Sequence, residues 1–394
     1  MIINGFSSSA VAAGIKYADR LDLGLIYSDT PVLTAGVFTT NQVKAAPVLL
    51  DQERLKQGRC QAIMVNSGCA NACTGAKGMQ AAIETSRMLA ELLAIPEDLV
   101  LVSSTGVIGM ELNVAAFDTN MPELVETLDP ANFEDVAQAI MTTDLTSKTA
   151  YRTVEIGGHE VSFMGMAKGS GMIMPNMATM LSFILTDARI CLSGLNNALK
   201  SAVDQTFNRI TIDGDTSTND MVLVMANGAA ENPVIDDGPD PDFQIFQDVL
   251  QSICRELALK IVADGEGATK CVTIRVCGAK EDQDAEIMAR TVANSNLVKT
   301  AFFGEDANWG RIIAAMGRSG VRFNPDKVDI AFGDVLMVRA GQGLGEEAEE
   351  AATAILKEPN FTLNIDLKDG AGCEEVHTCD FSVDYVRINA DYRS

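Results

Sequence analysis

Segments with the periodicity of strands alternate along this chain with segments that have the periodicity of helices. Residues 194–210 and 243–262 each place apolar side chains on one helical face, and the second helix is predicted to stop at Gly265. A shorter helix is expected over residues 85–95, because Pro96 disfavours its continuation. This alternation predicts the α/β fold class, in which helices pack onto β-sheets.

The predicted strands are bounded by turn residues. Residues 153–156 and 160–166 flank Gly157-Gly158 and are predicted to form a hairpin with a glycine turn. Residues 271–277 and 381–388 are further predicted strands. The last of these would hold the C-terminal end of the chain in place, since chain ends are otherwise mobile.

The length of 394 residues predicts two or three domains. The acidic stretch Glu231–Asp242 is expected to be an exposed loop, because helix-forming sequence resumes directly after it. A domain boundary is predicted instead at the charged turn Gly278–Asp284, which gives a first domain of residues 1–280 and a C-terminal domain of residues 281–394.

The charge of the chain excludes several classes of partner. It has 30 Lys and Arg against 54 Asp and Glu, so its formal net charge is −24. This charge argues against a nucleic-acid partner, which needs clustered basic residues, and against an anionic membrane surface. No apolar stretch reaches the roughly 18 residues of a membrane-spanning helix, and the first residues lack the basic region of a signal peptide. We therefore expect a cytoplasmic protein.

The nine cysteines form no C-x-x-C pair, and the chain has only two histidines. These spacings argue against a zinc site. Free cysteines are usually buried, so reduced and buried thiols are expected.

Three other motifs are incomplete. The acidic run that begins at Asp213 lacks the Gly and Glu that a calcium loop needs at its sixth and twelfth positions. Glutamates that would repel a pyrophosphate follow the glycines of residues 341–345. His159 lacks the second histidine of a zinc protease motif and is expected to be exposed in the hairpin.

The segment KGSGMIMPNMATML, residues 168–181, carries the most chemical information. Polar and flexible residues lead to Ala178-Thr179, and a strand-like apolar run over residues 180–185 follows. A threonine at the head of a buried strand is normally a β-branched strand former. Spacing alone therefore leaves two interpretations of Thr179 open, a structural residue and a nucleophile.

This segment resembles the self-cleavage segment of the ornithine acetyltransferase (glutamate N-acetyltransferase) family of arginine biosynthesis. Further segments resemble the same family in the expected order: VNSGCANACTG (65–75), SSTGVIG (103–109), TTDLTSK (142–148), DGDTSTND (213–220), DGEGATK (264–270), FFGEDANWGR (302–311) and INADYRS (388–394). The family usually has Asn where this chain has Cys69, and Thr where it has Ser394. Ser394 keeps the hydroxyl and the terminal carboxylate.

The resemblance implies self-cleavage between Ala178 and Thr179, with products 1–178 and 179–394. The Thr179 hydroxyl would attack the preceding carbonyl to give an ester, and water would release a new N-terminus. An α-amine has an ordinary pKa of about 7.7–8.0, so it can serve as the base for its own hydroxyl. Lys168 would lower the pKa of this amine by like-charge repulsion.

Thr105-Gly106 resembles the oxyanion hole of the family, with the Thr105 hydroxyl and the Gly106 N–H as donors. From the residues alone, it would be a plain glycine turn after a strand. The substrate pocket of the family carries over onto Thr142, Lys168, Thr179, Glu266, Asn389 and Ser394. In this pocket Lys168 suits a substrate carboxylate and Glu266 suits an ammonium or the leaving amine.

The fold implied by the resemblance is an α-β-β-α sandwich around the cleaved strand, with a smaller C-terminal α/β domain. The implied reaction moves acetyl from N2-acetylornithine to glutamate by ping-pong kinetics through acetyl-Thr179, with no metal or organic cofactor. Some members also use acetyl-CoA to make N-acetylglutamate, and the sequence leaves this open. The two fragments are expected to stay together and to form α2β2 assemblies.

Two other functions stay open at this point. A related self-processing aminopeptidase or amidase would pass its acyl group to water and would not need an acceptor pocket. A non-enzymatic acidic protein that binds small molecules would have a purely structural Thr179 and an intact chain.

Overall fold

A computed structural model describes residues 2–174 and 180–390 of the chain. The chain forms two compact units, Met1–Asn208 with Asp215–Ile261, and Arg209–Gly214 with Val262–Ser394. The second unit thus includes residues 262–280, which the sequence prediction places in the first domain. The reason is strand β10 (Cys271–Ala279), which pairs with two strands of the second unit.

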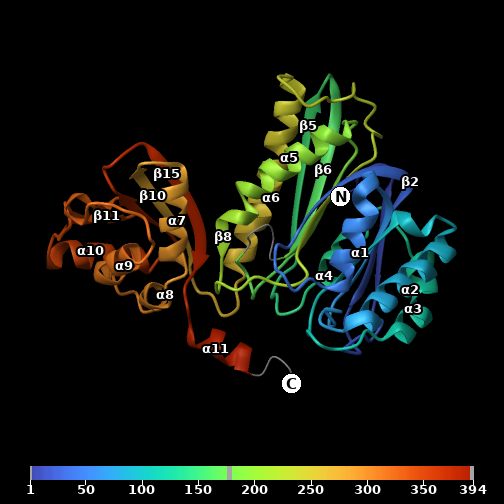
Figure 1. The fold of residues 1–394 in the computed structure, drawn as a ribbon, viewed down its shortest axis with the longest axis horizontal. Coiled ribbons are helices and arrows are strands. Elements are labelled where there is room, and N and C mark those ends of the chain that lie inside the picture. The colour runs from blue at the N-terminus through green and yellow to red at the C-terminus, as the bar shows by residue number, and fades with distance from the viewer. Residues whose placement is uncertain (1, 175–179, 391–394) are drawn as a thin grey trace. The chain divides into compact units, whose positions relative to one another are not determined.

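The first unit is built on a mixed sheet of order β4-β3-β2-β9-β7-β6-β5, in which β1 also pairs with β2 (Figure 1). Its strands are β1 (Phe6–Val11), β2 (Leu23–Phe38), β3 (Arg59–Asn66), β4 (Val100–Ser104), β5 (Lys148–Ile156), β6 (His159–Lys168), β7 (Leu181–Thr186) and β9 (Met221–Ala226). Two neighbouring pairs are parallel, β3 with β4 and β7 with β9. The predicted strand after the cleavage segment is confirmed as β7, inside the sheet between β6 and β9.

Helices cover both faces of this sheet. They are α1 (Ala46–Arg54), α2 (Gly75–Leu93), α3 (Val114–Glu126), α4 (Phe133–Ala139), α5 (Leu192–Asp204) and α6 (Pro241–Ala263). Leu25 of β2 packs in a cluster with α2 and α3, whereas Ile26 packs in a cluster with Val136 of α4. Successive side chains of a strand point to opposite faces, so these helices lie on opposite sides of β2.

The predicted helices of the first unit are confirmed. The helix predicted over residues 194–210 is α5, and the one over residues 243–262 is α6. The helix predicted over residues 85–95 is the last part of the longer α2, which ends where Ala94 adopts a left-handed conformation with φ 54°. The glycine hairpin is confirmed by the pairing of β5 with β6, and His159 is exposed as expected.

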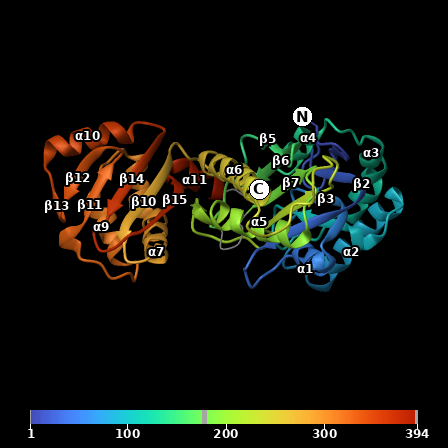
Figure 2. The same cartoon turned by 90° about the horizontal axis from the view of Figure 1, so that it is seen from above.

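The second unit has its own mixed sheet, of order β13-β12-β11-β14-β10-β15-β8 (Figure 2). Besides β10, its strands are β8 (Ile210–Thr211), β11 (Asp329–Phe332), β12 (Val335–Arg339), β13 (Gln342–Gly343), β14 (Asn360–Asp366) and β15 (Gly372–Cys379). Its helices are α7 (Asp282–Ala293), α8 (Asn296–Phe303), α9 (Trp309–Gly317), α10 (Glu346–Leu356) and α11 (Val383–Ala390). Val272, Ile274 and Val276 alternate along β10 and pack in one core with residues of α7, α8, α9 and α10.

The predicted strand over residues 381–388 is wrong, because most of this segment forms helix α11. The Ser382 hydroxyl oxygen accepts hydrogen bonds from the N–H groups of Asp384 at 3.2 Å and Tyr385 at 3.4 Å. Such bonds satisfy the donors of a first helical turn. The ring of Phe381, which precedes the helix, also stacks on that of Tyr385 in its first turn, with centroids 4.4 Å apart.

The prediction of reduced thiols is wrong for one pair, since Cys277 and Cys373 are joined by a disulfide. They are direct partners on the antiparallel strands β10 and β15, although 96 residues separate them in sequence. The seven other cysteines are free, and four of these are buried as expected: Cys60, Cys69, Cys254 and Cys379. Burial raises the pKa of the Cys60 and Cys254 thiols to about 12.

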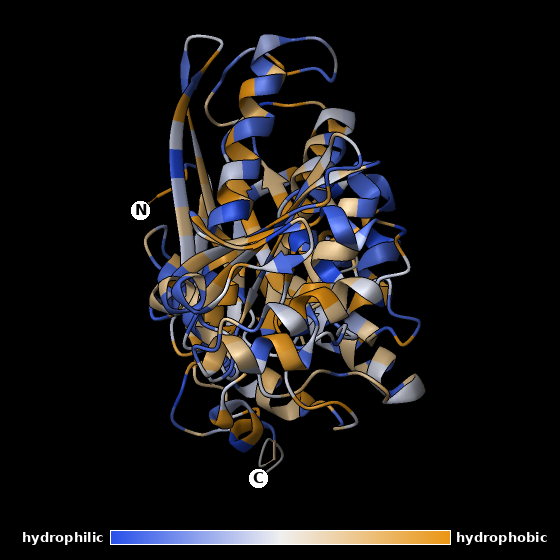
Figure 3. Cartoon of the chain, turned by 90° about the vertical axis from the view of Figure 1, so that its left-hand side faces the viewer, coloured by the Kyte–Doolittle hydropathy of each residue, from blue (hydrophilic) through white to orange (hydrophobic). Residues whose placement is uncertain are grey.

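The predicted α/β class, with a smaller C-terminal α/β part, is confirmed, and the β layers are two mixed sheets, one in each unit. Figure 3 shows hydrophobic and hydrophilic residues alternating along the helices, as amphipathic elements require. Across residues 2–174 and 180–390, no helix combines the length and the apolar character that crossing a membrane requires.

Candidate active site

The predicted cleavage segment leads into the interior of the first sheet. Leu181 opens β7, and its partners are Lys168 at the end of antiparallel β6 and Met221 at the start of parallel β9. Three predicted site residues lie outside the described residues: Ala178, Thr179 and Ser394. The other predicted site residues of the first unit lie around the start of β7 and the end of β4.

The predicted oxyanion turn follows β4 directly. Thr105 N–H donates to the Asn66 carbonyl at 2.9 Å, and Val107 N–H donates to the Gly68 carbonyl at 3.2 Å. Gly106, between them, has φ 130°, and a Cβ there would lie 2.3 Å from the Gly68 carbonyl carbon. Only glycine fits this position. In the part of the chain that the structure describes, Gly106 N–H makes no hydrogen bond, which is what an oxyanion donor requires.

Two predicted site residues meet at this turn. Lys168 Nζ donates a hydrogen bond to Thr105 Oγ1 at 3.2 Å, although 63 residues separate them. Both side chains are buried, with exposed fractions of 9% for Lys168 and 8% for Thr105. The Thr105 oxygen acts as acceptor in this bond, so its own proton can be donated elsewhere. The ammonium also polarises the hydroxyl, which strengthens it as a donor.

Asp144 connects the predicted pocket residue Thr142 to the end of β6. Its Oδ2 accepts from Thr142 N–H at 3.0 Å, and its Oδ1 accepts from Gly169 N–H at 2.7 Å. Oδ1 also accepts from Lys148 Nζ at 2.7 Å. Burial would raise the pKa of this carboxyl, but the charges of Lys168 and Lys148 together with the hydrogen bonds lower it to about 2.

Asp220 is a second buried carboxyl close to Lys168, and it has the opposite electrostatics. It directly precedes β9, and its exposed fraction is 2%. Burial raises its pKa well above the usual range, against the lowering influence of hydrogen bonds from Ser217 and the charge of Lys168. Its Oδ2 has no hydrogen-bond partner among the described residues. The two buried carboxyls near Lys168 therefore have pKa values shifted in opposite directions, lowered for Asp144 and raised for Asp220.

Two buried asparagines hold the oxyanion turn, and the sequence prediction missed both. Asn66 Nδ2 donates to the Cys69 carbonyl at 3.0 Å, and its Oδ1 accepts from Ser104 Oγ at 2.7 Å. Asn219 Nδ2 donates to the carbonyls of Ala70 at 2.6 Å and Ser104 at 2.8 Å. Both lie in segments that resemble the family, and only their tertiary contacts reveal what they position.

Cys69 lies in this scaffold as a structural residue. Its side chain is fully buried, and its Sγ lies 3.3 Å from the carbonyl oxygen of Met110. Burial raises the pKa of its thiol. The backbone of this residue contacts the turn, through its carbonyl to Asn66 and through β-bridges to Thr105 and Val107.

Two other predicted pocket residues meet in the second unit. Asn389 Nδ2 in α11 donates to Glu266 Oε2 at 2.7 Å. Glu266 is buried, with an exposed fraction of 6%, and it precedes Gly267, whose φ is 66°. A Cβ at Gly267 would lie 2.6 Å from the Tyr385 N, so this loop is held closely against the start of α11.

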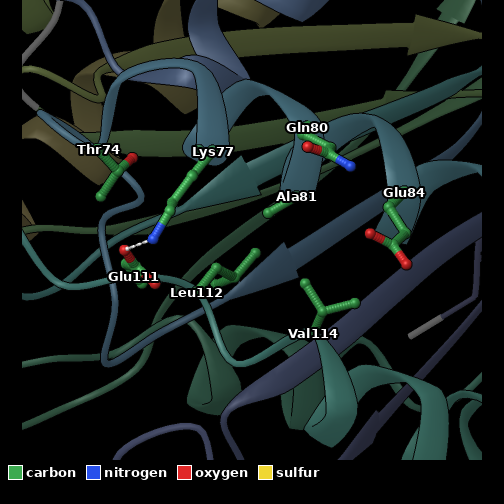
Figure 4. A pocket seen from close by; sticks show the side chains of 9 residues that line it. Thr74, Lys77, Gln80, Ala81, Glu84, Glu111, Leu112 and Val114 are labelled. Atoms are coloured by element: carbon green, nitrogen blue, oxygen red, sulfur yellow. Dashed lines mark hydrogen bonds and ion pairs between the residues drawn. The ribbon is translucent and has the colours of Figure 1, made fainter.

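A separate pocket of about 180 Å³ lies against α2 in the first unit (Figure 4). Lys77 Nζ and Glu111 Oε1 form an exposed ion pair at its edge, 2.7 Å apart. None of the predicted site residues lines it. Across the described residues, no cluster of three or more His, Cys, Asp or Glu side chains is arranged to hold a metal ion.

The match of this chain to a known family extends over residues 7–394, and the family is ArgJ. The chain belongs to the ArgJ family. The arginine biosynthesis bifunctional protein ArgJ of Desulfotalea psychrophila is 66% identical over 394 residues, with all of both chains covered. The ArgJ protein of Geobacter sulfurreducens is 51% identical over 394 residues, again with all of both chains covered.

A solved ArgJ structure is also similar to this chain. The crystal structure of the Bacillus halodurans ArgJ protein is 48% identical, with a TM-score of 0.52, and it covers 54% of this chain and 99% of that chain. The predicted ornithine acetyltransferase family is confirmed, and so is the prediction of an arginine biosynthesis enzyme.

Proposed function

We propose that this ArgJ-family enzyme transfers acetyl from N2-acetylornithine to glutamate through an acetyl ester on Thr179. The observation that carries the proposal is the contact between Lys168 Nζ and Thr105 Oγ1, 3.2 Å long and buried, in a chain that matches the family over residues 7–394. It puts an ammonium and a polarised hydroxyl donor beside the strand that the Thr179 segment enters.

The first half-reaction acylates Thr179. Its α-amine takes the hydroxyl proton while the oxygen attacks the acetyl carbonyl carbon, whose π electrons move onto the carbonyl oxygen. When this oxyanion collapses, the carbon–nitrogen bond breaks, and the proton passes from the ammonium to the leaving amine of ornithine. In the second half-reaction the glutamate amine attacks the ester, Thr179 leaves with its proton restored, and N-acetylglutamate is released.

The Thr105 hydroxyl and the Gly106 N–H stabilise the oxyanion in both half-reactions. Removing one such donor typically raises the barrier by about 3–4 kcal/mol. Lys168 raises the donor strength of Thr105, and it also attracts the substrate carboxylate and lowers the pKa of the Thr179 amine by like-charge repulsion.

The remaining pocket residues hold the ends of the substrate. Thr142 is linked to the Lys168 end of β6, because Asp144 accepts from both Thr142 N–H and Gly169 N–H. Glu266, held by Asn389 at 2.7 Å, suits the ammonium of ornithine or the leaving amine. Ser394 supplies a hydroxyl and the terminal carboxylate to the same pocket, as the family resemblance implies.

Self-cleavage between Ala178 and Thr179 would expose the amine that this mechanism needs. Its second product, 179–394, has 394 − 178 = 216 of the 394 residues. The Bacillus halodurans ArgJ chain, matched over 99% of its own length, covers a similar share of this chain, 54%. This agreement supports a chain that is split into two products.

We further propose that the enzyme accepts acetyl-CoA as a second donor, which the word bifunctional in the names of its relatives supports. The two products would stay together in α2β2 assemblies in the cytoplasm. None of these steps calls on a metal or an organic cofactor.

The test is mass spectrometry and N-terminal sequencing of the purified enzyme. We expect two fragments, the second beginning at Thr179. Thr179→Ala should abolish both cleavage and transfer, whereas Thr179→Ser should keep part of each because it preserves the hydroxyl. An intact chain of 42.0 kDa with full transferase activity would contradict the mechanism.

Product analysis with and without glutamate separates this function from its main alternative. Transfer gives N-acetylglutamate only when glutamate is present. Equal release of ornithine and free acetate without glutamate would instead indicate a self-processing aminopeptidase or amidase.

A further inference from the structure

The Asp144 carboxylate joins three segments of the first unit that surround the predicted site. It accepts hydrogen bonds from Thr142 N–H, from Gly169 N–H and from the ammonium of Lys148, at 3.0, 2.7 and 2.7 Å. These donors belong to the loop before β5, the residue after β6 and the first residue of β5. One carboxylate thus holds two backbone N–H groups and the side chain of Lys148.

Two of these segments carry residues that the proposed reaction uses. Thr142 itself donates to Asp144, and Gly169 directly follows Lys168, whose ammonium reaches Thr105. A shift of the Gly169 backbone would move Lys168 along with it. The contact between Lys168 and Thr105 therefore depends on a carboxylate that, among the described residues, makes no hydrogen bond to the Thr105 hydroxyl.

The chemistry of these contacts requires a carboxylate. All three partners of Asp144 are donors, and an ionised carboxylate only accepts hydrogen bonds. An asparagine would turn an NH2 group toward one of the two backbone N–H donors. The side chains of Asp144 and Lys148 have exposed fractions of 0% and 1%, so water cannot replace a lost contact.

We propose that Asp144 is a positioning residue of the reaction, one that holds Thr142 and Lys168 in register with the oxyanion donor Thr105. This inference rests on the proposed function, because it assigns Asp144 to the same site.

The first unit offers a matched control in Asp187. This carboxyl is also buried, with an exposed fraction of 3%, and its Oδ1 accepts from Ser162 N–H at 2.7 Å. It follows the last residue of β7, whereas Lys168 pairs with the first residue of that strand. Asp187→Asn therefore changes a similar buried contact at the other end of the strand.

The experiment compares wild type, Asp144→Asn and Asp187→Asn by thermal unfolding, by mass spectrometry of the fragments and by steady-state kinetics. We expect both variants to unfold at lower temperature. For Asp144→Asn we expect kcat/KM for N2-acetylornithine to fall on the order of 10²-fold, as misplacement of a reacting group does, with a raised KM. For Asp187→Asn we expect kcat and KM per folded enzyme to stay within about twofold of wild type.

A double variant separates positioning from simple charge pairing. Lys148→Met combined with Asp144→Asn removes both members of the buried pair, so it should regain stability relative to Asp144→Asn alone. If Asp144 positions the site, the double variant stays as slow as the single one. Recovery of wild-type kinetics in the double variant, or wild-type KM and kcat in Asp144→Asn, would overturn the inference.

The same experiment distinguishes a failure of this inference from a failure of the proposed function. Cleavage and transfer by the wild type test that function without any variant. A wild type that transfers acetyl normally beside an Asp144→Asn enzyme with unchanged kinetics overturns only the role of Asp144. A wild type that transfers no acetyl overturns the proposed function, and with it the inference that rests on it.

Discussion

Each unit buries a lysine whose ammonium donates to a threonine hydroxyl, and the two pairs differ in their surroundings. In the second unit, Lys299 Nζ lies 2.9 Å from Thr378 Oγ1 and also donates to the Cys379 carbonyl. The Thr378 hydroxyl lies 3.4 Å from that same carbonyl oxygen, so its proton is used inside the fold. In the first unit, the hydroxyl of Thr105 accepts from Lys168, and among the described residues it donates to nothing.

The two lysines also differ in the charge of their neighbours. Lys299 Nζ lies over the Phe381 ring, 5.2 Å from its centroid, in contacts with neutral groups. Lys168 lies close to Asp144 and Asp220, and its threonine precedes a glycine with an unused N–H. The Thr378 hydroxyl thus has an acceptor inside its unit, whereas the Thr105 hydroxyl has none among the described residues, as its proposed role as an oxyanion donor requires.

The largest expected difference comes from removing each hydroxyl. Thr105→Val should lower kcat by about 10²–10³-fold per folded enzyme, because it removes one proposed oxyanion donor. Thr378→Val should leave kcat unchanged per folded enzyme and lower the free energy of unfolding by about 1–3 kcal/mol, because it leaves the Lys299 ammonium with one partner fewer. Steady-state kinetics and urea unfolding of both variants check this. An equal loss of kcat in both variants would contradict the distinction between the two pairs.

The second largest effect is expected in the pH dependence of the free energy of unfolding, which should involve the first lysine–threonine pair and not the second. The pKa of Asp144 is about 2 in the folded chain, below its ordinary 3.8, so folding favours its ionised form. Its contribution of about 2 kcal/mol is complete above the ordinary pKa and is lost as the pH falls through about 2. The pH dependence of the Asp220 contribution has the opposite sign, because folding favours the protonated form of this carboxyl. Its stabilisation is complete below the ordinary pKa and is lost as the pH rises through the raised pKa.

Urea unfolding between pH 2 and pH 7 measures these contributions. Asp144→Asn should flatten the acid limb of the stability curve, and Asp220→Asn should remove the loss at higher pH. Thr378→Val should shift the whole curve without changing its shape, because Lys299 contacts the uncharged Thr378 hydroxyl, Cys379 carbonyl and Phe381 ring. A changed slope in Thr378→Val would show that the second pair is coupled to a titrating group.

The smallest expected effect concerns the start of α11. Ser382→Ala removes the hydroxyl that accepts from Asp384 and Tyr385, and a lost cap of this kind costs about 0.5–2 kcal/mol. Because Asn389 of the same helix holds Glu266, we expect a modest rise in KM with kcat unchanged. Kinetics of Ser382→Ala beside Ser382→Asp, which keeps a capping oxygen, check this. Identical KM values in both variants would contradict the role of the cap.

Long elements with a clear period could be predicted from the sequence. The apolar faces of α5 and α6 repeat over three or more turns, and the Gly157-Gly158 pair specifies the hairpin between β5 and β6. Thr105, Lys168 and Glu266 came from the family resemblance. The structure brings Lys168 to Thr105, while the role of each residue stays a prediction.

Elements that depend on tertiary contacts could not be predicted. Residues 381–388 read as a strand because the segment is short, and its helix is set by Ser382 and by the Phe381–Tyr385 stack. Asp144 and Asn219 look like ordinary loop residues in the sequence, because their distant partners, Gly169 for Asp144 and the Ala70 and Ser104 carbonyls for Asn219, appear only in the fold. The Cys277–Cys373 disulfide depends on the register of two strands 96 residues apart.

If the backbone is cut after Ala178 as proposed, the strand order of the first sheet governs whether the two products separate. β7 and β9 belong to product 179–394, yet they lie between β2 and β6, which belong to product 1–178. Six residue pairs join β2 to β9, and six more join β6 to β7. Separation would require both ladders to open at once, so an affinity tag on either fragment should retain the other until the enzyme is denatured.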